Sequence, residues 1–504
     1  MKINERSLFS AFLSIFGASL GDLVISVFFT PLLVRVLGAG RYGDYAFVLS
    51  VLGLLIIFAN SGVTVGAKKY LSEKNRPQSW QSDVFGFYMR VSLVLVTLVS
   101  LPVLLLSFFD FFGFVEERLV LYLQLMVGIL LFKQVYWFTK NALQGMGYER
   151  YSEPIKILQR GSFACLALGL AYLGYGVPGV LTGYVLSLAL AILAMTIYLS
   201  KIVDLRSIVR SHVTLPRRQM LTFNLVNVLL MFLIETLYNF DIILLRLFAG
   251  ETPTGYYKGA LVVAQLMLLL PSALQSLLLH SSSNYWSGDE REKITTVGTL
   301  ATRVTLVTSF LMAAGLVVLA DEFMPLYFGS DYTAAVSPIV LLLPGVIGLS
   351  MARPISAIIK GSGRLRVLVY ATGGAATINI VLNLLLIPLY GMDGAAVATS
   401  VGYGSMAVFS TLAARHVGFD PTADLRLLRI CVSAFVATVV MYSVDLYVTN
   451  RFIGLAIIPV IGSVVYLAVI FRTGAISKQE ARRITEKLPD PVASRTDRIL
   501  SLIT

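Results

Sequence analysis

The stretch Tyr-Gly-Val-Pro-Gly at residues 175–179 is matched by Tyr-Gly-Met-Asp-Gly at residues 390–394. Two further pairs of stretches match in the same order and at nearly the same offset: Leu-Gln-Gly-Met-Gly at 143–147 with Ile-Lys-Gly-Ser-Gly at 359–363, and Arg-Val-Leu-Gly at 35–38 with Arg-Leu-Phe-Ala at 246–249. Ordered matches of this kind predict a duplicated unit of roughly 200 residues. In an apolar chain, such a duplication is typical of transporters that are built from repeated helix bundles.

The composition indicates a membrane protein. The chain has 504 residues, of which 57% are hydrophobic and 13% are charged, whereas a soluble domain has about 25% charged residues. Apolar runs of about 20 residues, the length that crosses a bilayer, recur from end to end. We therefore predict an all-α polytopic membrane protein without a soluble domain. The net charge of +12 is interpreted as basic loops that orient the helices, not as a nucleic-acid surface.

The apolar pattern predicts about fourteen membrane-spanning helices. Their expected ranges are 8–36, 44–67, 84–109, 118–141, 155–173, 178–200, 219–248, 256–281, 296–320, 334–358, 367–388, 394–414, 427–448 and 452–471. The first six helices form an N-terminal lobe (residues 1–200), a linker follows (201–218), and the next six form a second lobe (219–420). Two extra helices (427–471) and a basic tail (472–504) complete the chain.

The basic residues predict how the helices are oriented. They are concentrated in alternate loops: after the second helix, in the linker, after the tenth helix and in the tail. The positive-inside rule places these regions, and both termini with them, on the cytoplasmic side of the cell membrane. Each lobe has an even number of helices, so the two lobes insert in the same direction as parallel repeats.

Motifs of catalysis are missing from the sequence. It contains no nucleotide-binding glycine-rich loop, metal triad or nucleophile motif. The two cysteines, Cys165 and Cys431, lie in apolar runs without disulfide or metal-ligand spacing. We therefore expect neither an enzyme nor a cofactor or metal.

Acidic residues within the spans are candidates for function, because a charge in hydrocarbon is costly and usually faces a cavity or a partner. Asp22 is central in the first helix, Glu235 lies at mid-depth in the seventh, and Asp241 lies nearer the outer end of the seventh. Two interpretations remain for Asp22 and Glu235: a cavity role or a buried structural pair. In the cavity interpretation, the three acids bind a coupling cation or hydrogen-bond a sugar.

Basic residues within the spans are the second set of candidates. Arg35 and Arg246 hold matching places at the outer ends of the first and seventh helices, and Lys258 begins the eighth. Lys133 and Lys140 share a face of the fourth helix, since they are seven residues apart. Each of these residues other than Lys133 either lines a cavity or extends toward the lipid headgroups. The same alternatives hold for three arginines that are expected near the inner face: Arg90, Arg160 and Arg353.

Amide side chains add a further polar signal. Asn224 and Asn227 lie in the seventh helix, and Asn379 and Asn383 lie in the eleventh. Spacings of three and four residues put each pair on one face of its helix. The pairs either line a cavity or form hydrogen bonds between helices, and we favour the hydrogen bonds.

Several motifs taken together point to a known family. They are Thr-Pro-Leu-Leu-Val-Arg-Val-Leu-Gly at 30–38, Tyr-Gly-Asp-Tyr-Ala at 42–46, Asn-Ser-Gly-Val at 60–63, Gln-Gly-Met-Gly at 144–147, Asp-Ile-Ile-Leu-Leu at 241–245, Gly-Tyr-Tyr at 255–257 and Leu-Leu-Pro-Ser-Ala at 269–273. This set resembles the polysaccharide flippases that export O-antigen-type lipid-linked oligosaccharides. Those flippases belong to the multidrug/oligosaccharidyl-lipid/polysaccharide exporter superfamily.

The resemblance implies two six-helix lobes around a cavity that is lined chiefly by helices 1, 2, 7 and 8. It implies a flippase that moves a polyprenyl- or dolichyl-(pyro)phosphate-linked sugar from the inner to the outer leaflet by alternating access, for cell-surface glycan assembly or protein glycosylation. The basic candidates would hold the phosphate, with Arg35, Arg246 and Lys258 ranked above Lys133 and Lys140. Partners would be membrane lipids, the lipid-linked sugar, and glycosyltransferases or a polymerase of the same pathway.

Two alternatives to a flippase stay open. A small-solute or multidrug cation antiporter of the same superfamily should have acidic cavity residues and little cationic character, whereas this chain has charges of both signs. A non-transporting membrane scaffold of a glycan assembly complex is the second alternative.

Overall fold

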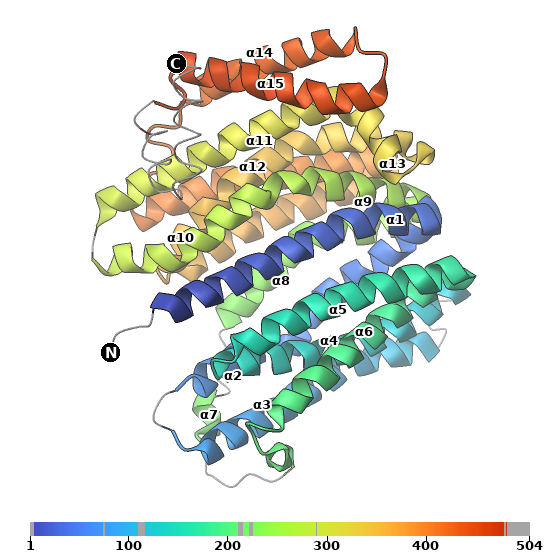
Figure 1. Cartoon of the computed structure of the whole chain (residues 1–504), viewed down its shortest axis with the longest axis vertical. Helices are drawn as coiled ribbons and strands as arrows, with labels where there is room; N and C mark the ends of the chain where they lie inside the picture. The colour runs from blue at the N-terminus through green and yellow to red at the C-terminus, as the bar shows by residue number, and fades with distance from the viewer. Residues whose placement is uncertain are drawn as a thin grey trace. The chain divides into compact units, whose positions relative to one another are not determined.

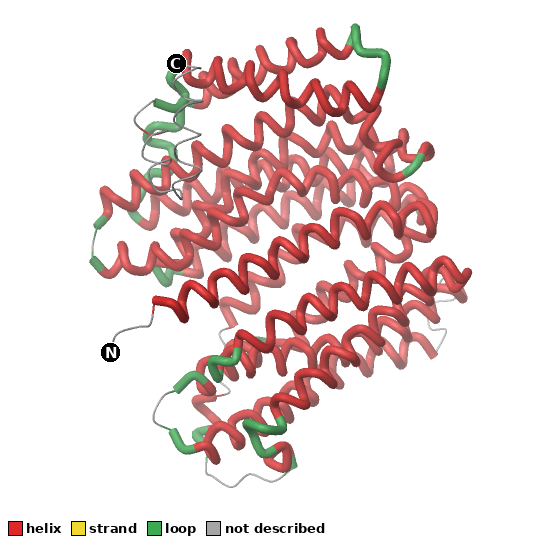
Figure 2. The backbone as a smooth tube through the Cα atoms, viewed as in Figure 1, coloured by secondary structure: helices red, strands yellow, loops and turns green. Residues whose placement is uncertain are grey.

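The computed structural model describes residues 5–73, 76–108, 116–209, 215–220, 225–288, 290–477 and 480. Among these residues, every regular element is a helix (Figure 2). Contacts divide the chain into two compact units, residues 1–255 and 256–504, with the boundary inside α9. The division into six-helix lobes, with its linker at 201–218, stays a prediction.

The first unit comprises the helices up to the start of α9 (Figure 1). They are α1 (Glu5–Asn60), α2 (Val63–Leu71), α3 (Gln78–Phe108), α4 (Glu117–Gly145), α5 (Glu149–Leu170), η1 (Ala171–Tyr175), α6 (Gly176–Leu199), η2 (Leu205–Ile208), α7 (Arg217–Met220), α8 (Leu225–Ala249) and α9 (Glu251–Gln265). Within this unit α8 packs against α1, and α5 packs against α6.

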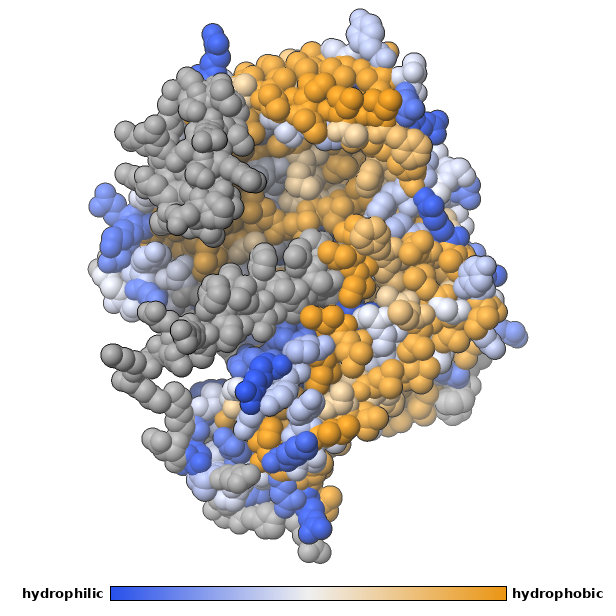
Figure 3. Space-filling view, viewed as in Figure 1, coloured by the Kyte–Doolittle hydropathy of each residue, from blue (hydrophilic) through white to orange (hydrophobic). Residues whose placement is uncertain are grey.

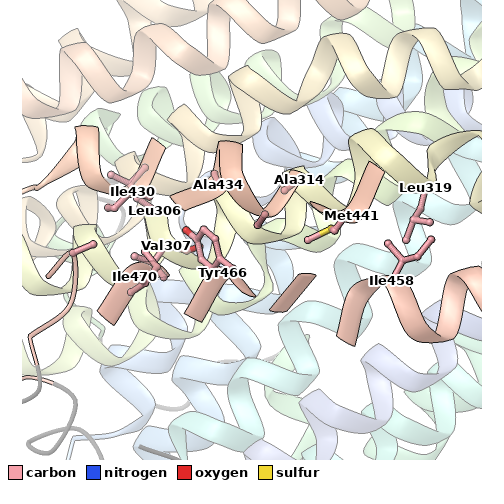
Figure 4. Packing of buried hydrophobic residues seen from close by; sticks show 12 residues of the cluster. Leu306, Val307, Ala314, Leu319, Ile430, Ala434, Met441, Ile458, Tyr466 and Ile470 are labelled. Atoms are coloured by element: carbon pink, nitrogen blue, oxygen red, sulfur yellow. The ribbon is translucent and has the colours of Figure 1, made fainter. Parts of the chain in front are cut away.

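The second unit continues from α9 to the tail. Its elements are η3 (Leu266–Leu268), α10 (Leu269–Ser287), α11 (Arg291–Phe328), η4 (Ser330–Ala335), α12 (Val336–Gly361), α13 (Leu365–Val417), α14 (Leu427–Asp445) and α15 (Arg451–Thr473). Buried residues of α11, α14 and α15 form an apolar core (Figure 4). Tyr466 lies in this core and satisfies its hydroxyl by donating to the Val307 carbonyl at 2.8 Å.

The outer surface of the second unit is apolar where α14 and α15 form a hairpin. Leu428, Phe435 and Val460 expose 78%, 70% and 62% of their surface, and this region is mostly hydrophobic in the space-filling view (Figure 3). An exposed apolar surface of this kind is unfavourable in water but compatible with the hydrocarbon chains of lipids. The apolar exterior agrees with a multi-pass membrane protein.

Eleven helices are long and apolar enough to cross a membrane among the described residues. Three of them are interrupted by glycines with non-helical backbone angles: α1 at Gly38, the run Glu149–Leu199 at Gly174 and Gly176, and α13 at Gly391. Each of the three therefore consists of two arms. If every arm crosses the membrane once, the spans agree with the fourteen that the sequence predicts, but that number stays a prediction.

The duplicated motifs share local backbone geometry. Gly176 has φ 55° and ψ −138°, and its counterpart Gly391 has φ 56° and ψ −128°. Gly147 and its counterpart Gly363 have φ values of 83° and 75°. Residues with a Cβ rarely adopt positive φ, so these positions favour glycine. Two of the predicted motif pairs thus share these backbone angles, and the repeat itself stays a prediction.

Candidate functional site

A cavity of about 550 Å³ lies within the first unit. Side chains from α1, α4, α5, α6 and α8 line it. Its polar and aromatic lining comprises Tyr45, Asn60, Ser61, Lys133, Trp137, Arg160, Tyr184, Asn227, Glu235 and Asn239. A polar cavity among apolar helices is where a membrane protein handles a polar ligand, since ionisable groups in a bilayer normally face a partner or a cavity.

One part of the lining, from α4, α5 and α6, is cationic and aromatic. Lys133 and Trp137 are four residues apart on α4, and the Lys133 Nζ lies 5.1 Å from the centre of the Trp137 ring. Arg160 comes from α5. Phe163, three residues after Arg160 on α5, also lines the cavity, and its ring packs against that of Tyr184 of α6 with ring centres 4.7 Å apart. These residues supply positive charge for an anion and flat apolar faces.

The other part of the lining, from α1 and α8, is rich in amides and carries a carboxylate. Asn239 donates from Nδ2 to the Glu235 Oε2 at 2.8 Å, one helical turn away. Ser50 of α1 donates to the Asn239 Oδ1 at 3.4 Å. Asn60, at the end of α1, accepts from the Thr64 hydroxyl at 3.0 Å. The cavity therefore combines a cationic part with a carboxylate–amide part.

A second charged region of the first unit is closed and internally paired. Arg246 of α8 donates from Nε to the Asp44 Oδ1 at 2.7 Å, and its Nη2 lies 3.3 Å from Glu116 and 3.6 Å from Glu251. Arg118 pairs with the same carboxylates, including Glu251 and, at 2.5 Å, Glu116. We call these five residues the Arg246 cluster. The side chain of Arg246 is 8% exposed and that of Asp44 is fully buried.

Close backbone packing brings the Arg246 cluster together. A Cβ atom added at Gly43 would lie 1.9 Å from the Glu251 carbonyl oxygen, and one added at Gly255 would lie 1.9 Å from the Ala39 carbonyl oxygen. Only glycine permits this approach of α1 to the first turn of α9. The approach places Glu251 beside the Asp44–Arg246 pair.

The basic candidates differ in the contacts that they make. Three carboxylates surround Arg246 and Arg118, so a phosphate would have to displace acidic partners that are already in place. Lys140 lies 3.6 Å from Glu153. By contrast, Lys133 lines the cavity, together with Arg160, which is not among the phosphate residues ranked from the sequence. The structure thus places Lys133 and Arg160 in the cavity lining and Arg246 among carboxylates, and the phosphate role of each stays a prediction.

The remaining candidates lie elsewhere. Arg35 is exposed on α1, and Lys258 is partly buried in the second unit. Asp241 is fully buried, and its Oδ1 accepts a hydrogen bond from the Ile242 backbone N–H at 2.8 Å. The side chain of Asp22 lies outside the described residues. Of the three acidic candidates, Glu235 is therefore the one whose described side chain lines the cavity.

Of the two amides of α13, Asn379 forms hydrogen bonds between the helix arms, whereas the buried Asn383 amide makes none with the described residues. Asn379 donates at 3.4 Å to both the Ala398 carbonyl and the Thr399 hydroxyl, which lie on the other arm of α13. Tyr257 donates to the same hydroxyl at 3.0 Å. For Asn379 this agrees with the interpretation that we favoured from the sequence. No group of three metal-ligating side chains occurs in the part of the chain that the structure describes.

Comparisons with known proteins agree with this architecture. A family model described as "Polysaccharide biosynthesis protein" matches residues 9–278. The "Probable low-salt glycan biosynthesis flippase Agl15" of Haloferax volcanii is 24% identical over 403 residues, which cover 77% of this chain and 79% of that protein.

Solved structures give the same fold. The "Lipid II flippase MurJ, inward closed conformation" has a TM-score of 0.73 and 16% identity, with 91% of this chain and 98% of MurJ covered. An inward-facing multidrug resistance MATE family transporter of the MOP superfamily has a TM-score of 0.67 and 16% identity, with 78% and 94% covered. The chain thus shares its fold with these two solved structures.

Proposed function

The chain belongs to the polysaccharide biosynthesis protein family, and from this premise we propose that it is a flippase for a lipid-linked saccharide. Its substrate is a polyprenyl- or dolichyl-(pyro)phosphate-linked sugar, which moves from the inner to the outer leaflet by alternating access. The relative named as a glycan biosynthesis flippase supports the substrate class. Glycosyltransferases or a polymerase of the same pathway are the partner proteins in this proposal, and both termini are cytoplasmic.

The observation that carries the proposal is the mixed lining of the cavity. A lipid-linked sugar has an anionic phosphate, a hydroxyl-rich head and an apolar tail. Lys133 and Arg160 supply charge for the phosphate, and Asn60, Glu235 and Asn239 supply hydrogen-bond partners for hydroxyls. The tail stays in the bilayer, because the outer helix surfaces are already suited to lipid.

The cations are needed for a physical reason. An isolated charge cannot leave water for an apolar site without a partner, because the transfer costs many kcal/mol. Arginine and lysine offset that cost with charge-assisted hydrogen bonds to phosphate oxygens. Arg160 can donate two parallel bonds, whereas Lys133 acts as a point charge. Arg35 and Lys258 stay proposals for further phosphate contacts.

The acidic residues divide between the two remaining roles. Glu235 lines the cavity and is proposed to contact sugar. Asp241 is buried, and we propose it, with Asp22, as a ligand for a coupling cation. A cation antiporter of the same superfamily is the alternative function, and the MATE-like fold favours it. Such an antiporter would need Glu235 but would be hindered by Lys133 and Arg160.

The proposal is tested in proteoliposomes that contain the full chain and a fluorescent polyprenyl-phosphate hexose. Quenching by a membrane-impermeant reductant reports how much of the probe reaches the outer leaflet. Lys133→Ala and Arg160→Ala should each slow translocation by about 10- to 100-fold, as expected for the loss of one hydrogen-bonded charge. Lys201→Ala, which removes an exposed lysine outside the cavity, should leave the rate unchanged.

Two results would reject the proposal. One is translocation in the Lys133→Ala/Arg160→Ala double variant at the rate of the unmodified protein. The other is proton- or sodium-driven uptake of an organic cation by the unmodified protein, without any movement of the hexose probe; that result would favour the antiporter.

A further inference from the structure

The carboxylate–amide pair of the cavity is held in place by hydrogen bonds. The Asn239 side chain donates to Glu235 Oε2 at 2.8 Å and accepts from the Ser50 hydroxyl at 3.4 Å. Asn239 thus links α8 to α1 and orients its amide group. Both Glu235 and Asn239 line the cavity. The pair therefore presents a fixed acceptor and a fixed amide to whatever enters.

A glycine leaves room beside this pair. A Cβ atom added at Gly53 of α1 would lie 3.4 Å from Glu235 Oε2 and 3.5 Å from Asn239 Nδ2, which is ordinary van der Waals contact. A methyl group would therefore fit without a clash, but it would fill the space next to the carboxylate. Gly53 is also part of the cavity lining. With glycine at this position, a ligand has direct access to the Glu235–Asn239 pair.

The chemistry of the pair suits a neutral sugar. A carboxylate accepts hydrogen bonds from hydroxyl groups, and an amide both donates and accepts, so neighbouring hydroxyls of a sugar find complementary partners. A sugar that carries its own carboxylate or sulfate would bring a second negative charge toward Glu235. In a cavity of reduced dielectric constant, like charges repel much more strongly than in water.

The charge of Glu235 also favours one orientation of the substrate in the cavity. Lys133 and Arg160 attract any anion, so an acidic sugar could compete with the carrier phosphate for them. A carboxylate on α8 favours a ligand whose negative charge is confined to the phosphate. Cations on α4 and α5 then receive the phosphate, and the α1–α8 lining receives the hydroxyls.

We propose that Glu235 is a specificity-determining residue, which admits lipid-linked saccharides with a neutral sugar next to the phosphate and rejects those with an acidic sugar there. This inference rests on the proposed flippase function and names its substrate more closely. Asn239 acts as a positioning residue, because it holds the Glu235 carboxylate. Discrimination is expected to arise from repulsion of the wrong substrate as much as from contacts with the right one.

Two probes that differ only in sugar charge test this inference. They are a fluorescent polyprenyl phosphate that carries glucose and the same lipid that carries glucuronic acid. The unmodified full-length protein in proteoliposomes should translocate the glucose probe at least about tenfold faster, which corresponds to about 1.4 kcal/mol. In Glu235→Gln the ratio of the two rates should fall toward one, because the glucuronate probe gains speed.

Three further variants separate charge from shape. Glu235→Asp keeps the charge and should keep the preference for glucose. Gly53→Ala leaves all charges in place and should slow both probes by a similar factor. Asn227→Asp adds a second carboxylate to the lining and should increase the preference, which keeps the test decisive even if Glu235→Gln does not fold.

The outcomes distinguish the specificity inference from the flippase proposal. Equal rates for the two probes in the unmodified protein, or the same ratio in Glu235→Gln and Asn227→Asp, would overturn the role of Glu235 and leave the flippase proposal standing. Translocation of neither probe would overturn the flippase proposal itself, and the specificity inference with it.

Discussion

The cavity and the Arg246 cluster both contain charged residues, but the cluster is closed and the cavity is an open space. In the cluster, Arg246 and Arg118 lie among Asp44, Glu116 and Glu251, within a few ångströms of one another. In the cavity, cations from α4 and α5 line a space of about 550 Å³. The first unit thus has one group of charges that contact one another and another group that lines a cavity, and we propose that the second group meets the ligand.

Removal of Arg246 should give the largest effect on stability. Arg246→Ala leaves the fully buried Asp44 without its closest partner, which is expected to cost about 3–5 kcal/mol. Thermal unfolding of the detergent-solubilised protein measures this loss. Lys133→Ala should unfold within a few degrees of the unmodified protein, because the cavity is open. If Arg246→Ala were as stable as the unmodified protein but failed to translocate the substrate, Arg246 would be a substrate contact and not a structural residue.

Replacement of the glycines that bring the cluster together should have the next largest effect. Gly43→Ala places a methyl group against the Glu251 carbonyl, and overpacking of this kind costs about 1–3 kcal/mol. Gly161→Ala on α5 is the matched control, since no atom lies within 4 Å of its added Cβ. Equal unfolding temperatures for the two variants would show that the approach of α1 to α9 is not tight.

The smallest effect concerns pH. A hydrogen bond from Arg118, supported by Arg246, holds the pKa of Glu116 below its ordinary value of 4.5, although partial desolvation opposes the shift. A depressed pKa stabilises the folded protein above that ordinary value, and the contribution is lost as the pH falls through the folded pKa. When the pH is lowered from 6 to 3, the unfolding temperature of Glu116→Gln should therefore fall less steeply than that of the unmodified protein. Because Glu116 is 45% exposed, salt should reduce the difference between the two proteins. If the variant and the unmodified protein had the same pH dependence, the ion pairs of Glu116 would not contribute to stability.

The sequence predicts the helices, the repeat and part of the cavity. Lys133 and Glu235 are recognisable because a charge in the middle of an apolar helix is costly unless it faces a cavity or a partner. Arg160 is not recognisable in this way, because the expected span 155–173 puts it near a helix end, where an arginine can also extend to the headgroups. In the structure α5 begins at Glu149, so Arg160 lies in the middle of the helix. Whether it lines a cavity depends on the rotation of α5 about its own axis, which neighbouring helices determine. Trp137 gives no signal, because aromatic residues are common in membrane helices.

The partners of Arg246 could not be predicted from the sequence. The match between the Arg35 and Arg246 motifs predicts that Arg246 lies near the end of a helix, and the structure agrees. Its partners are distant in sequence, since Asp44 is 202 residues and Glu116 is 130 residues from Arg246. Helix periodicity carries no information on contacts over such separations. Gly43 and Gly255 lie within the Tyr-Gly-Asp-Tyr-Ala and Gly-Tyr-Tyr motifs. The motif pattern marks these positions as special without showing that they bring two helices together.

The glycine breaks of the long helices bear on how the chain enters the bilayer during synthesis. A continuous helix of 51 residues, the length of the run Glu149–Leu199, would measure about 77 Å, more than twice the roughly 30 Å of the hydrocarbon layer. The turn at Gly174 and Gly176 folds it into two packed arms without a polar loop. Such a hairpin can leave the translocon as one unit, and no hydrophilic connection has to be carried across.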